Sequence, residues 1–164
     1  MRVLIAGYGN CYRQDARAGH VLAPMIHQWL EDLGISVELY LDLKLLPEMV
    51  FYFSGFDHVV FIDANAQPLK QGFSLKRIVP DTTPPGTDLH VLSPGKLLAL
   101  LGQLDLPQPA DAFMLSVSGH SFDFSEELTP QCTSRIIDAF AAFKNWWETH
   151  EHTLNHISHA VSAG

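Results

Sequence analysis

Residues 2–10 read Arg-Val-Leu-Ile-Ala-Gly-Tyr-Gly-Asn, a short apolar run that is followed at once by two glycines within three residues. Such a run is typical of a strand that is covered on both faces of a sheet. A helical pattern comes next, because apolar residues recur at steps of three and four from Val21 to Leu33, and Gly34 ends it. The succession of strand, glycine turn and helix predicts a βαβ unit and a parallel sheet.

The remaining sequence continues this alternation of short β-rich runs and helical patterns. We expect further strands at Ile35–Leu41, His58–Ile62 and Ala112–Val117, and an antiparallel edge strand at Phe73–Val79. Helices are expected at Pro47–Ser54, at Lys96–Leu104 and after Thr129-Pro130, where a capping residue precedes a proline. The sequence therefore predicts an α/β fold, a three-layer sandwich with a twisted, mostly parallel five-stranded sheet and helices on both faces.

Length and charge limit the functions open to this chain. Its 164 residues fit one domain, which we place at residues 1–149, with residues 150–164 as a frayed tail. With 10 basic and 18 acidic side chains the net charge is -8, which disfavours nucleic acid as a partner. Neither a signal peptide nor a membrane span is recognisable, and two cysteines fit a reducing compartment. We expect a cytoplasmic monomer with no membrane partner.

Candidate chemistry is expected where parallel strands end, because ligands of open α/β sheets bind outside the carboxyl ends of the strands. Asp63 ends a buried strand, and its carboxylate there either binds a metal or cationic group or caps a loop through backbone N–H groups. His90 follows a loop rich in proline and glycine, and alone it is more typical of a loop residue. Together the two side chains would supply two ligands of a cation site.

The glycine loop leaves several alternatives open. Gly7-Tyr8-Gly9 resembles the start of a dinucleotide-binding loop, but the third glycine position is Tyr12, so a plain turn is the simpler interpretation. Arg13 and Arg17 flank Asp15 and either pair with loop acids or steer an acidic group into the crevice. Cys11 is a possible nucleophile on the same loop, with no histidine that the sequence fixes beside it.

Nine histidines are the unusual feature of the composition. Four of them, His150, His152, His156 and His159, fall in the tail, where a spacing of four residues could place two ligands on one helical face. No HExxH motif is present, so we interpret this cluster as a solvated tail with adventitious metal affinity. His90, with His20 and His120 as weaker candidates in crevice loops, remains for a functional site.

Taken in order, five blocks of sequence resemble the nickel-iron hydrogenase maturation endopeptidases. The matching residues run over positions 1 to about 140: residues 1–10 with Arg13, Asp15 and Gly19; Leu45-Leu46-Pro47-Glu48; Val59-Val60-Phe61-Ile62-Asp63-Ala64; His90-Val91-Leu92-Ser93-Pro94 with Leu97-Leu98-Ala99-Leu100; and Ser121-Phe122 with Glu127-Leu128-Thr129-Pro130. No single block is specific, but the series is.

The resemblance implies an α/β protease whose partner is the hydrogenase large subunit precursor. Such proteins bind the nickel already placed in the precursor and remove its C-terminal extension, so nickel comes with the substrate and no metal is held permanently. The implied metal-sensing ligands are an acid in the glycine loop, an acid that ends the central strand and a downstream histidine. Asp63 matches the second and His90 the third, and both would be catalytic. The glycine-loop residues implied in substrate binding are Gly7, Gly9, Asn10 and Arg13.

The first ligand departs from the family pattern, because Ala16 stands where the family has an acid. A methyl group cannot coordinate nickel, so two of three protein ligands remain unless Asp15 or His20 turns into the site. Three outcomes are open at this point. The protein cleaves with an altered site, binds the hydrogenase subunit without cleaving it, or has been reused for another carrier role.

Overall fold

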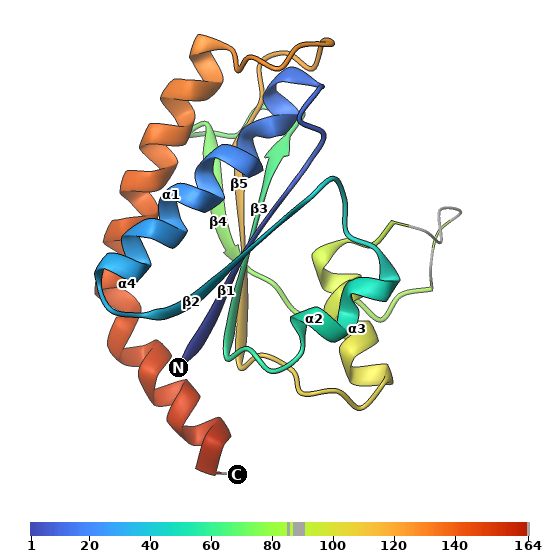
Figure 1. The fold of residues 1–164 in the computed structure, drawn as a ribbon, viewed down its shortest axis with the longest axis vertical. Helices are drawn as coiled ribbons and strands as arrows, with labels where there is room; N and C mark the ends of the chain where they lie inside the picture. The colour runs from blue at the N-terminus through green and yellow to red at the C-terminus, as the bar shows by residue number, and fades with distance from the viewer. Residues whose placement is uncertain (85, 87–90, 164) are drawn as a thin grey trace.

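The fold is built on one five-stranded sheet (Figure 1). The computed structural model describes residues 1–84, 86 and 91–163, with side chains up to residue 151. The strands follow the order β2-β1-β3-β5-β4, with β1 at Arg2–Tyr8, β2 at Ser36–Asp42, β3 at His58–Asn65, β4 at Phe73–Arg77 and β5 at Asp111–Ser118. All neighbouring strands are parallel except β4, which is antiparallel to β5 at one edge. This confirms the predicted mixed sheet and its edge strand.

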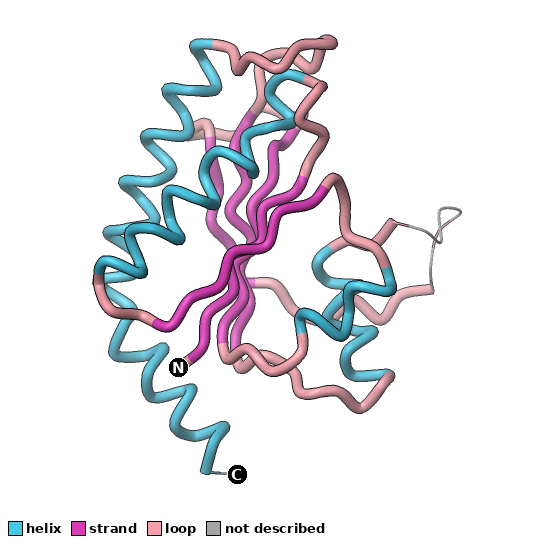
Figure 2. Tube along the Cα trace, in the orientation of Figure 1, coloured by secondary structure: helices cyan, strands magenta, loops and turns pink. Residues whose placement is uncertain are grey.

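Helices cover both faces of the sheet and complete the predicted three layers (Figure 2). On one face lie α1, Ala18–Asp32, and α4, Pro130–Ala163, and on the other lie α2, Val50–Phe53, and α3, Pro94–Gln103. Two short 3-10 turns, η1 at Gln14–Arg17 and η2 at Pro47–Met49, precede α1 and α2. At the start of α3 the Ser93 hydroxyl accepts a hydrogen bond from Lys96 N, as the Ser-Pro pair predicts.

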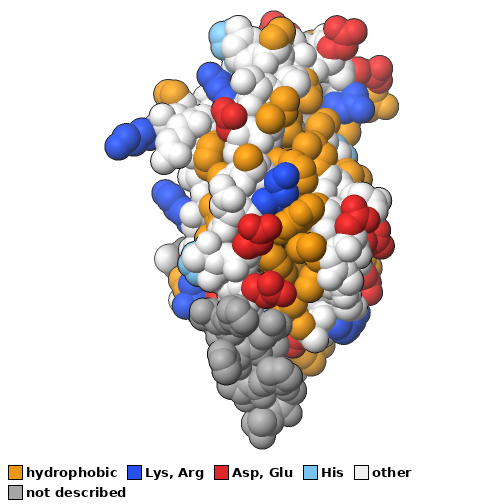
Figure 3. Space-filling view, turned by 90° about the vertical axis from the view of Figure 1, so that its left-hand side faces the viewer, with side chains coloured by type: hydrophobic (Ala, Val, Ile, Leu, Met, Phe, Trp, Pro, Cys, Tyr) orange, Lys and Arg blue, Asp and Glu red, His pale blue; other side chains and the backbone are white. Residues whose placement is uncertain are grey.

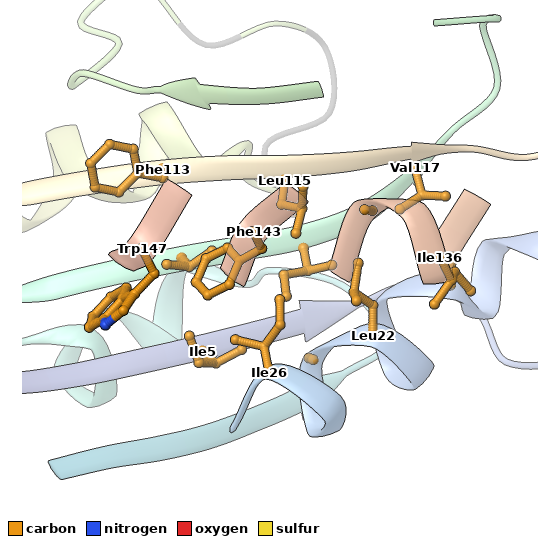
Figure 4. Packing of buried hydrophobic residues seen from close by; sticks show 14 of the residues in the cluster. Ile5, Leu22, Ile26, Phe113, Leu115, Val117, Ile136, Phe143 and Trp147 are labelled. Atoms are coloured by element: carbon orange, nitrogen blue, oxygen red, sulfur yellow. The ribbon is translucent and has the colours of Figure 1, made fainter. Parts of the chain in front are cut away.

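The larger core lies between the sheet and the helices α1 and α4 (Figure 4). Leu22 and Ile26 of α1 and Phe143 and Trp147 of α4 meet strand residues such as Ile5, and all are essentially removed from water. These residues recur at helical spacing in the sequence, which is why the stripe of each helix was predictable. A second core, with Phe53 and Leu97 as members, fills the space under α2 and α3.

The last helix is longer than expected. It runs to Ala163, whereas the sequence predicts a domain that ends at residue 149. The side chains from residue 152 onward, among them His152, His156 and His159, lie outside the described part, so fraying of the tail stays a prediction. Within the residues that the structure describes, no helix combines the length and the apolar character needed to cross a bilayer.

Gly7 lets α1 pack directly on β1. A Cβ at Gly7 would lie 2.4 Å from the Gly19 carbonyl oxygen and 2.8 Å from Ala23 Cβ, both on α1. We therefore expect Gly7→Ala to lower the free energy of unfolding by about 1–3 kcal/mol, because neither backbone can move without opening the core. Urea denaturation measures this loss. The matched control is Gly86→Ala, where a Cβ would meet no atom of the described residues within 4 Å. An equal loss in both variants would contradict the packing explanation.

Candidate functional site

Side-chain alternation along the central strand directs Asp63 toward the α2 and α3 layer. Val59 and Phe61 belong to the core beneath those helices, and Asp63 continues the same row at the carboxyl end of β3. On the neighbouring strand β5, Ser116 is the register partner of Asp63. Tyr8 ends β1 on the other side and also packs against this core. Three strand ends thus bring a carboxylate and two hydroxyl groups together.

The two hydroxyl groups hold the Asp63 carboxylate. Ser116 Oγ donates to Asp63 Oδ1 at 2.8 Å, and the Tyr8 hydroxyl donates to Asp63 Oδ2 at 3.2 Å. Burial raises the pKa of Asp63 above its usual value, and the two hydrogen bonds offset that rise only in part. Burial, followed by the nearby Asp63 carboxylate, also raises the pKa of Tyr8, so the phenol remains a hydrogen-bond donor at neutral pH.

A small pocket of about 120 Å³ opens at this carboxylate. Its lining residues are Tyr8, Gly9, Ala16, Asp63, Ala64 and Phe122. The volume holds several water molecules. The position at which the family resemblance places an acid therefore lies in the same pocket as Asp63, but there the chain contributes the methyl group of Ala16. The resulting site has one carboxylate, one phenol and otherwise apolar walls.

A larger surface groove lies away from the carboxyl ends of the strands, and its lining is mostly apolar. It has a volume of about 520 Å³ and runs between α1 and α4, where Met25, Trp29 and Phe140 line it together with Asp32 and Lys144. Hydrophobic side chains form a band along this face of the molecule (Figure 3). None of the carboxyl strand ends contributes to that groove, so the Asp63 pocket is the better candidate site.

Asp15, the substitute ligand that the sequence leaves open, is engaged in joining two loops. Its Oδ2 accepts hydrogen bonds from His120 N at 2.7 Å, Ser121 N at 3.0 Å and Thr129 Oγ1 at 2.7 Å, and its Oδ1 accepts one from Thr129 N at 2.8 Å. The residue is 0% exposed. Burial alone would raise the pKa of Asp15, but the bonds from Thr129, Ser121 and His120 lower it below its usual value. The carboxylate is thus committed to these donors and does not line the pocket.

The four predicted substrate-binding residues all lie on or beside the glycine loop, but each has a different environment. Gly9 lines the pocket, with a φ of 144°, and a Cβ there would lie 2.1 Å from the Ala16 carbonyl oxygen. Gly7 is buried against α1 and serves packing. Asn10 Oδ1 accepts a hydrogen bond from Tyr12 N at 2.9 Å, which fixes the turn. Arg13 reaches the surface, where its guanidinium lies over the ring of Phe124.

Of the other candidates, those that the structure describes do not line the pocket. His90 lies outside the described residues, so its role as a ligand stays a prediction. His20 Nε2 is engaged with the Asp42 carbonyl oxygen at 2.9 Å. Cys11 is partly exposed, whereas Cys132 is buried and has its pKa raised to about 12 by burial and then by Asp15. Among the described residues, no group of three histidine, cysteine or acidic side chains could hold a metal ion.

Tyr8, Ser116 and Phe122 belong to the site but were not singled out as site residues from the sequence. Tyr8 appeared there as part of a glycine turn, Ser116 as part of an apolar strand and Phe122 only as part of a family block. A strand-end tyrosine followed by glycine gives no signal of which carboxylate it contacts. Only the register that pairs Asp63 with Ser116 brings them together.

Comparison with solved structures identifies the fold. The hydrogenase maturating endopeptidase HybD from E. coli superposes with a TM-score of 0.64 at 18% identity, covering 91% of this chain and 93% of its own. The [NiFe] hydrogenase maturation protease HycI from Thermococcus kodakarensis KOD1 gives 0.59 at 20% identity, with coverages of 87% and 89%. HybD from Thermococcus kodakarensis gives 0.57 at 18% identity, with coverages of 89% and 99%. No family model matches this chain, and no curated protein matches it in sequence. The expected resemblance is thus confirmed for the fold.

Proposed function

We propose that this chain recognises the large subunit precursor of a nickel-iron hydrogenase and removes its C-terminal extension. The observation that carries the proposal is the position of Asp63, a half-buried carboxylate in a pocket at the carboxyl end of the central strand. Supporting it, the fold is shared over nearly the full length of proteins described as hydrogenase maturation proteases. In the same proposal the reaction takes place in the cytoplasm.

The proposed chemistry is hydrolysis assisted by the metal of the substrate. Nickel arrives in the precursor, Asp63 and His90 engage it, and a water molecule attacks the scissile bond that this contact brings close. The water oxygen bonds to the scissile carbonyl carbon, the C–N bond breaks, and a proton from the water ends on the leaving amine. No permanently bound metal is needed, because the precursor supplies the ion as cargo.

A second candidate function, binding of the subunit without cleavage, is favoured by the environment of Ala16. Its methyl group lines the pocket that holds Asp63, and the adjacent Asp15 is occupied by four hydrogen bonds. The chain would then accompany the precursor as a maturation factor. The structure gives less support to a dinucleotide site, because Gly7, the first glycine of that pattern, is packed against α1.

Restoring an acid at position 16 separates the two candidates. If the native chain binds without cleaving, we expect Ala16→Asp to confer extension removal, because a second carboxylate then faces the nickel beside Asp63. If the native chain is a protease, it shortens the precursor itself, and the variant raises the rate by about tenfold or more. The measurement is the change in mass of a nickel-loaded precursor over time. Ala16→Asn is the matched control, since it has the same size without the charge.

The control decides how the result is interpreted. Equal gains from the Asp and Asn variants would contradict a role of charge at position 16. Cleavage by the native chain rules out the binding-only function. Absence of both binding and cleavage by the native chain, with a precursor from the organism that carries it, contradicts the proposed function as a whole.

A further inference from the structure

Two aromatic side chains on the loops that line the Asp63 pocket lie largely in solvent. Phe124 is 85% exposed and Tyr12 is 65% exposed. The Arg13 guanidinium carbon lies 4.2 Å from the centroid of the Phe124 ring. We call Tyr12, Arg13 and Phe124 the aromatic rim. Aromatic residues and arginine are enriched where proteins bind one another, and exposed aromatic area gains free energy when a partner covers it.

The aromatic rim is fixed in place by contacts between its two loops. Ser125 N donates to the Tyr12 carbonyl oxygen at 3.1 Å, and Gln14 N donates to the Ser125 carbonyl oxygen at 2.9 Å. Arg17 Nη1 donates to the Glu126 carbonyl oxygen at 2.8 Å. The four hydrogen bonds to Asp15 join the same loops from inside. The aromatic side chains are therefore presented on a preorganised surface, which lowers the entropic cost of binding a partner.

Charge and continuity indicate what covers the rim. Within the described part of the chain, Arg13 forms no ion pair with a carboxylate, although the chain as a whole has a net charge of -8. An acidic group on a partner would supply the missing counter-charge. The loop that carries Tyr12 also carries Ala16, and the loop that carries Phe124 also carries Phe122, so both loops continue directly into the pocket.

We propose that the aromatic rim binds the peptide segment of the hydrogenase large subunit precursor that leads into the Asp63 pocket. An apolar side chain of that segment packs against Tyr12 and Phe124, and a carboxylate pairs with Arg13. This assignment rests on the proposed function for the identity of the partner. It adds a recognition surface outside the pocket, one that works equally for a cleaving and a non-cleaving protein.

Binding of purified, nickel-loaded precursor to the full chain tests the proposal. We expect Tyr12→Ser and Phe124→Ser each to raise the Kd by about tenfold or more, as truncation of a central aromatic contact does. Arg13→Gln should weaken binding most at low ionic strength. The control is Phe51→Ser, because Phe51 is 67% exposed but belongs to α2 and not to the rim loops. Its Kd should stay within twofold of that of the native chain.

The outcomes are separable from those for the proposed function. If the native chain binds the precursor and the Tyr12→Ser and Phe124→Ser variants bind it with the same affinity, the rim proposal is overturned while the proposed function stands. Equal weakening by Phe51→Ser overturns it as well, because the effect is then not specific. If the free native chain forms a dimer and Phe124→Ser abolishes that dimer, a second copy of the chain, and not the precursor, covers the rim. If the native chain binds no precursor, the proposed function fails and the partner named here fails with it. Thermal unfolding shows that each variant is folded.

Discussion

We expect Asp63→Asn to lower the rate of extension removal by about 100-fold or more, because the amide does not carry the negative charge that faces nickel. Mass spectrometry of the precursor measures this rate. In the non-cleaving alternative the same substitution raises the Kd of the complex by at least about tenfold, since a buried charge contact is lost. Both readouts use the same nickel-loaded precursor.

The folded state should tolerate this substitution. Asn is the same size as Asp, and Ser116 and Tyr8 donate to different carboxylate oxygens. In the variant one hydroxyl still donates to the amide oxygen, and the other can rotate and accept from the amide N–H. Burial raises the pKa of Asp63, so its ionised form opposes folding at neutral pH and its removal costs no stability. The free energy of unfolding at pH 7 should therefore be the same in Asp63→Asn as in the native chain, or slightly higher.

Tyr8→Phe is the graded control for Asp63. It removes the hydrogen bond to Asp63 Oδ2 but leaves the carboxylate and the bond from Ser116. Its effect on cleavage or binding should be clearly smaller than that of Asp63→Asn. If folded Asp63→Asn cleaves and binds the precursor like the native chain, Asp63 does not recognise the nickel-loaded precursor.

The sequence predicted the layers of the fold because each layer leaves a periodic signal. The apolar runs of β1 and β3 indicated buried parallel strands, and the stripe that includes Phe143 and Trp147 indicated the face of α4 that packs. Phe73–Val79 alternated like an edge strand and forms β4, which ends at Arg77. Such patterns depend only on neighbours in the chain, so they survive without knowledge of the tertiary structure.

The candidate site was predicted only in part, because its contacts join distant segments. Asp63 was recognisable as a polar residue that stops a buried strand. Ser116 is 53 residues away from it, and its contact follows from a strand register that no local pattern encodes. The role of Asp15 was missed for the same reason, since its donors lie 105 to 114 residues further along the chain. Because Asp15 precedes Ala16, the position where the family has an acid, it resembled a substitute ligand until the structure showed its hydrogen-bond donors.

The largest loss of stability is expected from Asp15→Asn. Asp15 differs from Asp63 in that three of its four donors are backbone N–H groups, which cannot turn round and accept. An amide nitrogen at the Oδ2 position would face His120 N and Ser121 N, and at the Oδ1 position it would face Thr129 N. Either orientation leaves a buried donor without an acceptor. We expect a loss of about 3 kcal/mol in the free energy of unfolding, and a fall in Tm of about 10 °C.

The pH dependence of this difference follows from the direction of the Asp15 pKa shift. Hydrogen bonds lower the pKa of Asp15 in the folded state, so its carboxylate contributes stability fully at pH values above the ordinary pKa of about 4. That contribution is lost as the pH falls through the lowered value, when the native chain protonates as well. The difference in Tm between the native and Asp15→Asn chains should therefore be constant from pH 5 to 7 and should shrink below pH 4.

Asp138→Asn, the same change at an exposed site on α4, should leave Tm within about 2 °C of the native value. If the difference in Tm did not change with pH, the shape of the Asp15 side chain, and not its charge, would join the two loops. The rim and the pocket walls would then not depend on an ionised carboxylate.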